Sequence, residues 1–186
     1  MVTPSTLQRP TVFVMKSDDA PAVLTDLKVD TVAVVGEINA DRTLYHFTLS
    51  FFNSSTNASV RFDMHPSATD LNDMFRGIIV VEYLSYPFTT LAGGEDWKPA
   101  TPHILKLSST YTIGEISSAI FEKGRDRYRF NDLGQGCRHW CANIIHDLEV
   151  LGWAKDIEQS FEDWEAESSK LLGPRFPMPR ITGVFY

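Results

Sequence analysis

Hydrophobic residues in the first half of the chain occur in short runs that are rich in β-branched and aromatic side chains. Polar residues, glycine or proline separate these runs, and this pattern is typical of β-strands joined by turns. The runs are residues 11–15, 31–38, 43–51, 58–64, 77–86 and 103–107. The polar segment after the third run is typical of a hairpin loop, so we expect the third and fourth strands to pair antiparallel.

Hydrophobic residues in the second half recur at the spacing of amphipathic helices. Thr112 and Glu115 have the capping-box pattern of a helix start. The pattern predicts three helices, from Thr112 to about Lys123, from about Cys137 to about Gly152, and from about Asp156 to Leu172. The proline-rich tail, about 173–186, is expected to be extended. Strands first and helices last indicate one α+β domain over residues 1–186.

Length and composition fit a globular protein with a single core. The chain has 186 residues, of which 43% are hydrophobic and 22% are charged. No segment approaches the roughly 20 apolar residues that cross a bilayer. Residues 1–6 lack the basic and then apolar pattern of a signal peptide, so we expect a soluble, cytoplasmic protein. The net charge of −7 argues against a nucleic-acid binder, because a basic surface supplies much of that affinity.

Cys137 follows a glycine-punctuated loop at the expected start of the second helix. A helix start presents unpaired N–H groups and the positive end of the helix dipole, and both favour a thiolate over a thiol. Cys137 is therefore the candidate nucleophile. Cys141 lies one turn later, where a disulfide with Cys137 has unfavourable geometry, so we interpret it as a core residue.

A thiol nucleophile needs a base and a third group that orients the base. His46 lies on the third predicted strand and is the candidate base. Asp63 and His65 lie two residues apart on the strand expected beside it, so they share a face. We favour Asp63, because a carboxylate also supports the imidazolium form, and keep His65 as the alternative.

The segment around Cys137 supplies candidates for the remaining roles. The backbone N–H of Cys137 is the first oxyanion donor, and the side chains of Gln135 or Asn131 could also donate. Trp140 is close in sequence and could line a substrate pocket. On a helix, His139 points away from Cys137, so we interpret it as a structural hydrogen-bonding residue.

The same residues admit other interpretations. Cys137 could be an inert core thiol, because it shares a helical stripe with Cys141 and cysteine is often buried. A zinc site is unfavourable, because the cysteine and histidine side chains between Cys137 and His146 crowd on one helix and cannot converge. The basic run 123–129 is either a solvated surface or a site for a substrate carboxylate or phosphate. We expect neither a metal nor another cofactor.

The segments around His46 and Cys137 resemble the circularly permuted papain-like group, which includes the lecithin:retinol acyltransferase-like proteins and the PPPDE thiol peptidases. Those families carry a histidine on an early strand and a later helix-starting motif of the form Asn-Cys-x-His-Phe. The matching segments are Tyr45-His46-Phe47 and Gly136-Cys137-Arg138-His139-Trp140, within residues 43–66 and 128–153. The resemblance implies a papain-like antiparallel sheet packed against the helix of Cys137, with an additional C-terminal helix. It also implies Cys137 as nucleophile and His46 as base.

Two positions depart from the family pattern. Gly136 replaces the usual asparagine, which removes a side chain that could cap the helix. The acyltransferase-like members carry a second histidine where this chain has Phe62-Asp63-Met64-His65, so the third catalytic member stays open between Asp63 and His65. The chain is also similar to uncharacterised small proteins of filamentous fungi, some of which accompany secondary-metabolite genes.

The residues and the resemblance together predict cysteine-dependent acyl chemistry on a small-molecule or peptide substrate. The reaction would be amide or thioester hydrolysis or acyl transfer, as in a papain-like cysteine hydrolase or acyltransferase. The alternative is a pocket protein of the same fold that binds or cyclises a small metabolite without a covalent intermediate. A structural partner protein is a third hypothesis, and it would need an exposed apolar patch formed with the tail 176–186.

Overall fold

The computed structural model describes residues 13–15, 25–38, 45–67, 71–84, 98–99 and 102–186. Its main sheet contains β1 (Phe13–Met15), β2 (Lys28–Ile38), β3 (Tyr45–Phe52), β4 (Ser59–Pro66), β5 (Gly77–Leu84), β6 (Lys98–Pro99) and β7 (His103–Thr112). The described strands lie in the order β1-β5-β4-β3-β2-β6, and β7 also pairs with β2. The β1–β5 pair is parallel and the other pairs are antiparallel.

The predicted strands are found, with shifted ends. The antiparallel pairing of β3 with β4 confirms the predicted hairpin. β7 is longer than predicted, because Tyr111 and Thr112 pair with Val29 and Lys28 beyond a shift in register. These partners are remote in the sequence, so the local serine- and threonine-rich pattern of that segment could not reveal the extension. Parts of three predicted strands lie outside the described residues, namely residues 11–12, 43–44 and 85–86.

Three helices, α2 (Ile113–Glu122), α3 (Cys137–Val150) and α4 (Ile157–Leu172), confirm the three that the sequence predicts. The capping box is also confirmed: the side chain of Thr112 accepts the N–H of Glu115, and the side chain of Glu115 accepts that of Thr112. The chain is thus an α+β protein with a mainly antiparallel sheet. Within the described residues, no helix is both long enough and apolar enough to cross a membrane.

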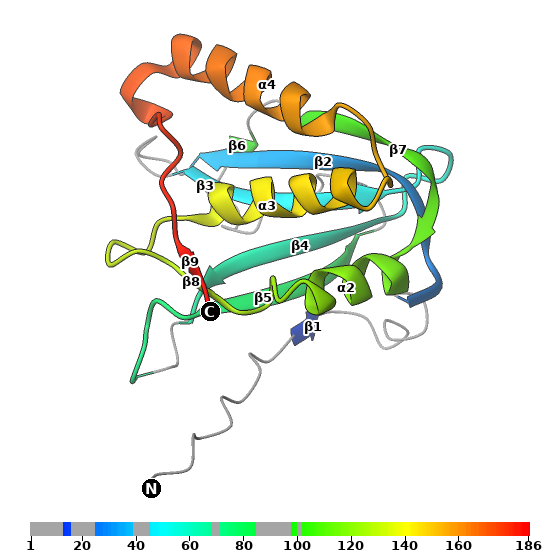
Figure 1. Ribbon diagram of the computed structural model, residues 1–186, viewed down its shortest axis with the longest axis horizontal. Coiled ribbons are helices and arrows are strands. Elements are labelled where there is room, and N and C mark those ends of the chain that lie inside the picture. The colour runs from blue at the N-terminus through cyan, green and yellow to red at the C-terminus, as the bar shows by residue number, and fades with distance from the viewer. Residues whose placement is uncertain (1–12, 16–24, 39–44, 68–70, 85–97, 100–101) are drawn as a thin grey trace, which may run out of the picture.

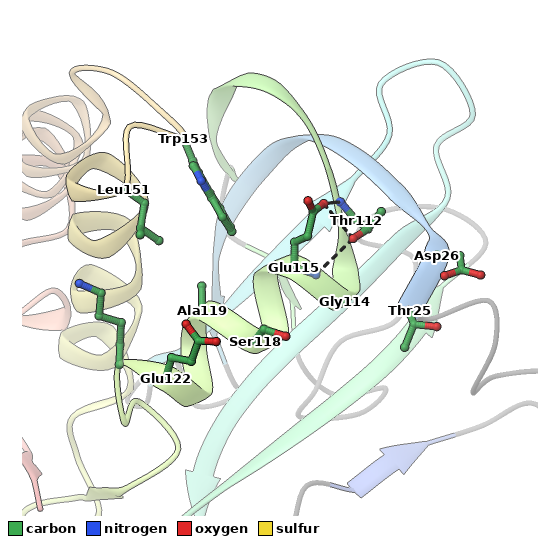
Figure 2. A pocket seen from close by; sticks show the side chains of 11 residues that line it. Thr25, Asp26, Thr112, Gly114, Glu115, Ser118, Ala119, Glu122, Leu151 and Trp153 are labelled. Carbon is green, nitrogen blue, oxygen red and sulfur yellow. Dashed lines mark hydrogen bonds between the residues drawn. The ribbon is translucent and has the colours of Figure 1, made fainter.

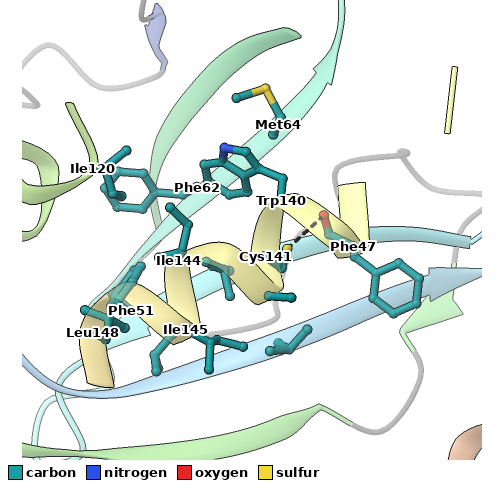
Figure 3. Packing of buried hydrophobic residues seen from close by; sticks show 14 of the residues in the cluster. Phe47, Phe51, Phe62, Met64, Ile120, Trp140, Cys141, Ile144, Ile145 and Leu148 are labelled. Carbon is teal, nitrogen blue, oxygen red and sulfur yellow. Dashed lines mark hydrogen bonds between the residues drawn. The ribbon is translucent and has the colours of Figure 1, made fainter. Parts of the chain in front are cut away.

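The core lies between α3 and the middle of the sheet (Figure 3). Ile144 and Leu148 of α3 lie among the sheet residues Phe51 and Phe62, and all four are buried. Burial of such side chains stabilises the fold by roughly 2 kcal/mol each. The helix that carries Cys137 is therefore fixed on the sheet by the largest hydrophobic cluster in the described part of the chain.

The C-terminal tail departs from the predicted extended segment at its first residues and ends in a short strand. It begins with a 3-10 turn, η1 (Gly173–Arg175), and its end, β9 (Val184–Phe185), pairs antiparallel with β8 (Tyr128–Arg129). Phe176 is buried in the core, whereas Met178, Val184 and Tyr186 are exposed. A pairing of two residues between remote segments leaves no local pattern, so the sequence could not predict it.

Candidate active site

His46 and Asp63 form a close pair where β3 and β4 are no longer paired. The Nε2 atom of His46 lies 2.6 Å from Oδ1 of Asp63, and their side chains are 16% and 11% exposed. The ladder between the strands starts only at Leu49 and Phe62, so both members of the pair lie beyond it. A carboxylate at this distance fixes the ring orientation and supports a proton on Nε2.

Cys137 is the first residue of α3, and its side chain hydrogen-bonds that of His46. Because Nε2 of His46 faces Asp63, the ring nitrogen that remains for Cys137 is Nδ1. The N-cap of α3 is Gly136, whose φ of 142° is a value that residues with a Cβ atom rarely adopt. The backbone itself therefore requires glycine, rather than asparagine, before the candidate nucleophile.

Cys141 holds the first turns of α3 against β3. Its thiol donates to the carbonyl oxygen of Phe47, the residue after His46, at 3.7 Å (Figure 3). Cys141 is fully buried, and burial raises the pKa of its thiol well above the ordinary value. The interpretation of Cys141 as a core residue is confirmed.

The ionisation of His46 and Asp63 is coupled. Burial lowers the pKa of His46, but the charge and hydrogen bond of Asp63, together with Cys137, outweigh it and raise that pKa well above 6.5. Burial raises the pKa of Asp63, but the charge and hydrogen bond of His46 outweigh it and lower that pKa below 3.8. Both shifts favour the charged forms, so a buried ion pair lies beside Cys137 at neutral pH.

His65 does not take the orienting position. Its Nδ1 atom lies 3.0 Å from the carbonyl oxygen of Pro66, and its charge acts on the carboxylate of Asp63. Of the two alternatives that the sequence leaves open, Asp63 is thus the residue in contact with His46.

The loop that leads into α3 is built around Asn131. Its side-chain oxygen accepts the N–H groups of Leu133 and Gln135 at 3.0 and 2.8 Å, and its own N–H donates to the carbonyl of Gln135. These bonds use the side-chain oxygen of Asn131 to shape the loop, a structural role that the sequence does not reveal. The side-chain amides of Asn131 and Gln135 stay predicted oxyanion donors.

Trp140 is not in the position of a pocket wall. Its side chain is fully buried in the core, and its indole Nε1 donates to the carbonyl oxygen of Arg125 at 2.8 Å. It shares the buried face of α3 with Ile144. The proposed pocket role is wrong for this conformation, because proximity to Cys137 in sequence does not place a helical residue on the same face.

Two arginines of the basic run 123–129 are bound by carboxylates of the protein itself. Arg125 binds Asp147 through two nitrogens at 2.5 and 2.9 Å, and Arg129 binds Asp73 at 3.2 Å. These acidic partners come from other elements, so charge spacing along the run could not reveal them. These two arginines therefore do not support the interpretation of the run as a site for a substrate carboxylate or phosphate.

The histidines near Cys137 also have structural partners. The Nδ1 atom of His139 lies 3.2 Å from the hydroxyl oxygen of Tyr128, and Nδ1 of His146 lies 2.9 Å from a carboxylate oxygen of Glu158. His139 is therefore a hydrogen-bonding residue, as the sequence predicts. Among the described residues, no group of three or more histidine, cysteine, aspartate or glutamate side chains is placed to hold a metal ion.

A buried charge cluster beside Cys137 was missed at the level of sequence. Glu165 of α4 is 1% exposed, and its carboxylate lies 3.0 Å from Nε of Arg138 and 3.0 Å from Nε of Arg180. The guanidinium of Arg138 also lies over the ring of Phe176, 4.1 Å from its centroid. The cluster joins α3, α4 and the tail, and only their packing brings these residues together.

A separate pocket of about 540 Å³ lies near the other end of α3 (Figure 2). Trp153, Leu151 and α2 residues such as Ser118 and Glu122 form its walls. Because α3 rises about 1.5 Å per residue, Leu151 lies roughly 20 Å from Cys137. The candidate catalytic residues do not line this pocket.

Comparison with known proteins identifies the family of the chain. Neither the curated proteins nor the solved structures gave a match. A family model, by contrast, matches residues 31–186, a range that includes His46, Asp63 and Cys137. The chain therefore belongs to the DUF7770 family, which is described as a domain of unknown function.

Proposed function

We propose that this protein is a cysteine-dependent enzyme of acyl-group chemistry, with Cys137 as nucleophile, His46 as base and Asp63 as the orienting residue. The observation that carries the proposal is the hydrogen-bonded series from Asp63 through His46 to Cys137 at the start of α3. A nucleophile, a base within its reach and a third group bound to the base are the parts that thiol catalysis needs.

In the proposed reaction His46 already carries the proton of Cys137 when the acyl donor binds, because its raised pKa favours the imidazolium form. The thiolate attacks the acyl carbon, so a C–S bond forms and the carbonyl electron pair moves to oxygen, near the N–H groups at the start of α3. When the intermediate collapses, the bond to the leaving group breaks and the His46 imidazolium supplies its proton. Water or an acceptor then attacks the thioester and gives its proton to His46. Collapse of this second intermediate breaks the C–S bond and expels the Cys137 thiolate beside the imidazolium, which restores the starting pair.

The ion pair of His46 with Asp63 supports this sequence of proton transfers. The raised pKa of His46 means that the ring retains the proton it receives until the leaving group needs it. Asp63 stays ionised because its own pKa is lowered, so the positive ring keeps its counter-charge throughout. The papain-like assignment of the fold is part of the same proposal, and it rests on the order of strand-borne His46 and helix-borne Cys137.

A second candidate function has one observation in its favour. The pocket beside Trp153 has a volume of about 540 Å³ and lies away from Cys137. A pocket of this size accommodates a small metabolite. In this alternative the protein binds or cyclises its ligand there by shape and hydrogen bonding, without a covalent intermediate.

The proposal is tested by the pH dependence of iodoacetamide alkylation at each cysteine, located by peptide mass spectrometry. Wild-type Cys137 should react below pH 7, and His46→Ala should slow it by about a hundredfold, because the thiol loses its base. Cys141→Ala is the matched control, because it removes the other thiol and leaves the ion pair intact. Acyl esters and thioesters should then acylate Cys137 in the control and leave Cys137→Ala unmodified.

Two results would count against the proposed chemistry. One is a Cys137 that reacts as slowly as the buried Cys141 across the pH range. The other is a reactive Cys137 whose rate does not change in His46→Ala. Either result directs attention to the pocket beside Trp153, where variants such as Trp153→Ala should reduce ligand binding if the second function holds.

A further inference from the structure

The hydroxyl of Tyr128 lies between two backbone segments that are remote in sequence. Its oxygen is 2.8 Å from the carbonyl oxygen of Gly136, 2.9 Å from the nitrogen of Gly183 and 3.2 Å from Nδ1 of His139. A tyrosine hydroxyl donates one hydrogen bond and accepts two. It donates to Gly136 and accepts from Gly183, and the third contact is satisfied when Nδ1 of His139 carries the proton.

The protonation states around Tyr128 fit this assignment. Burial raises the pKa of Tyr128 far above its ordinary value, so the hydroxyl keeps the proton that it donates. Burial and the positive charges of Arg180 and Arg125 lower the pKa of His139, so its ring is neutral at pH 7. A neutral ring with its proton on Nδ1 can donate to Tyr128.

The two glycines leave the space that the hydroxyl occupies. A Cβ atom on Gly136 would lie 2.5 Å from the oxygen of Tyr128, and one on Gly183 would collide with the same oxygen. Gly136 is the N-cap of α3 and has no capping side chain. Tyr128 therefore anchors the start of this helix from outside.

Gly183, which donates to the hydroxyl of Tyr128, belongs to the C-terminal end of the chain. Residues 176–186, which we call the C-terminal strap, run from α4 past the start of α3 to β8 (Figure 1). Within the strap, the carbonyl of Pro177 accepts a hydrogen bond from Arg138, and Phe185 pairs with Tyr128. The strap is thus held near its start by Arg138, which follows Cys137 in sequence, and near its end by Tyr128, which bonds Gly136 before it.

We infer that Tyr128 is a positioning residue for Cys137: through Gly136 it sets the start of α3, and through Gly183 it ties that start to the C-terminal strap. The inference rests on the proposed function of Cys137. Because Gly136 directly precedes Cys137, a shift of its carbonyl moves the sulfur relative to His46. A displacement of about 1 Å in such a pair can cost up to a hundredfold in rate.

Tyr128→Phe tests the inference, because it keeps the ring that packs against Phe130 and removes the hydroxyl alone. The alkylation rate of Cys137 is measured in wild type, Tyr128→Phe, His46→Ala and the double variant. Tyr128→Phe should slow the reaction by about tenfold, because the displaced thiol uses the base less well. This effect should largely vanish in the His46→Ala background, where no base is present and the position of the thiol relative to it no longer affects the rate. Tyr111→Phe, which removes a remote hydroxyl, is the matched control and should react at the wild-type rate.

A second variant, truncated after Thr182, tests the strap directly. It removes the N–H group of Gly183, which donates to Tyr128, and should reproduce the loss of alkylation rate expected for Tyr128→Phe. Alkylation of Cys141 is followed in each sample as a reporter of general opening, and it should stay slow.

The outcomes separate the inference from the proposed function. A His46-dependent rate that neither Tyr128→Phe nor the truncation changes overturns the inference alone. Single losses that multiply in the double variant, or a parallel gain in Cys141 alkylation, also overturn it, because they indicate a structural role only. A wild-type rate that does not depend on His46 overturns the proposed function and the inference together.

Discussion

Asp63 lies 2.6 Å from His46, although both residues lie beyond the segment in which β3 and β4 pair with each other. The backbones of β3 and β4 do not pair with each other at this point, and the strands are joined instead by the contact between these two side chains. Each holds the other in its charged form, and Cys137 contacts the pair. A change in any one of the three is therefore expected to alter the ionisation of the others.

Asp63→Asn should slow alkylation of Cys137 at pH 7 by about tenfold to a hundredfold. The amide preserves the shape of the carboxylate but no longer supports the imidazolium, so the pKa of His46 falls. The rate is measured by peptide mass spectrometry between pH 5 and 9. His65→Gln is the matched control and should have a much smaller effect, and the reverse order of effects would give the orienting role to His65.

The free energy of unfolding should depend on pH in two windows set by the ion pair. The pKa of His46 is raised on folding, so its contribution is complete below about 6.5 and is lost as the pH rises through the folded value. The pKa of Asp63 is lowered, so its contribution is present above about 3.8 and is lost as the pH falls through the folded value. Urea unfolding of wild type and His46→Gln at a series of pH values measures both windows. Parallel curves for the two proteins would show that the pair does not contribute.

Cys141→Ala should lower the free energy of unfolding by about 1–2 kcal/mol while leaving the reactivity of Cys137 intact. The side chain is fully buried, so its loss leaves a small cavity and removes the hydrogen bond to Phe47. Urea denaturation measures the stability and alkylation measures the reactivity. Cys141→Ser, which can still donate to Phe47, is the companion variant. A large loss of Cys137 reactivity in both variants would instead assign Cys141 a part in the site.

Glu165→Gln should destabilise the protein by about 3–5 kcal/mol, because it removes the carboxylate that pairs with the buried guanidinium of Arg138 and with the neighbouring Arg180. Urea unfolding measures the effect. Glu167→Gln, on the exposed side of the same helix, is the matched control and should leave the midpoint unchanged. Equal midpoints for the two variants would mean that the cluster contributes little to stability.

The hydrophobic pattern was sufficient to predict the elements that carry the site. Local spacing predicted α3 and its start at Cys137, because residues on one helical face must repeat at that spacing to be buried. The polar turn after β3 predicted the hairpin that brings His46 and Asp63 to neighbouring strands. Both of these inferences depend on residues close together in the chain, where sequence pattern and structure are directly linked.

Sequence by itself determined the α+β class, the three helices and the short list of groups able to perform thiol chemistry, because periodicity and side-chain chemistry are local properties. Only the tertiary structure decided which groups meet. It placed Asp63 rather than His65 on His46, buried Trp140 in the core and brought Tyr128, Gly136 and Gly183 together. These contacts join segments remote in the chain, and their geometry follows from how the helices and the tail pack on the sheet, which no local pattern encodes.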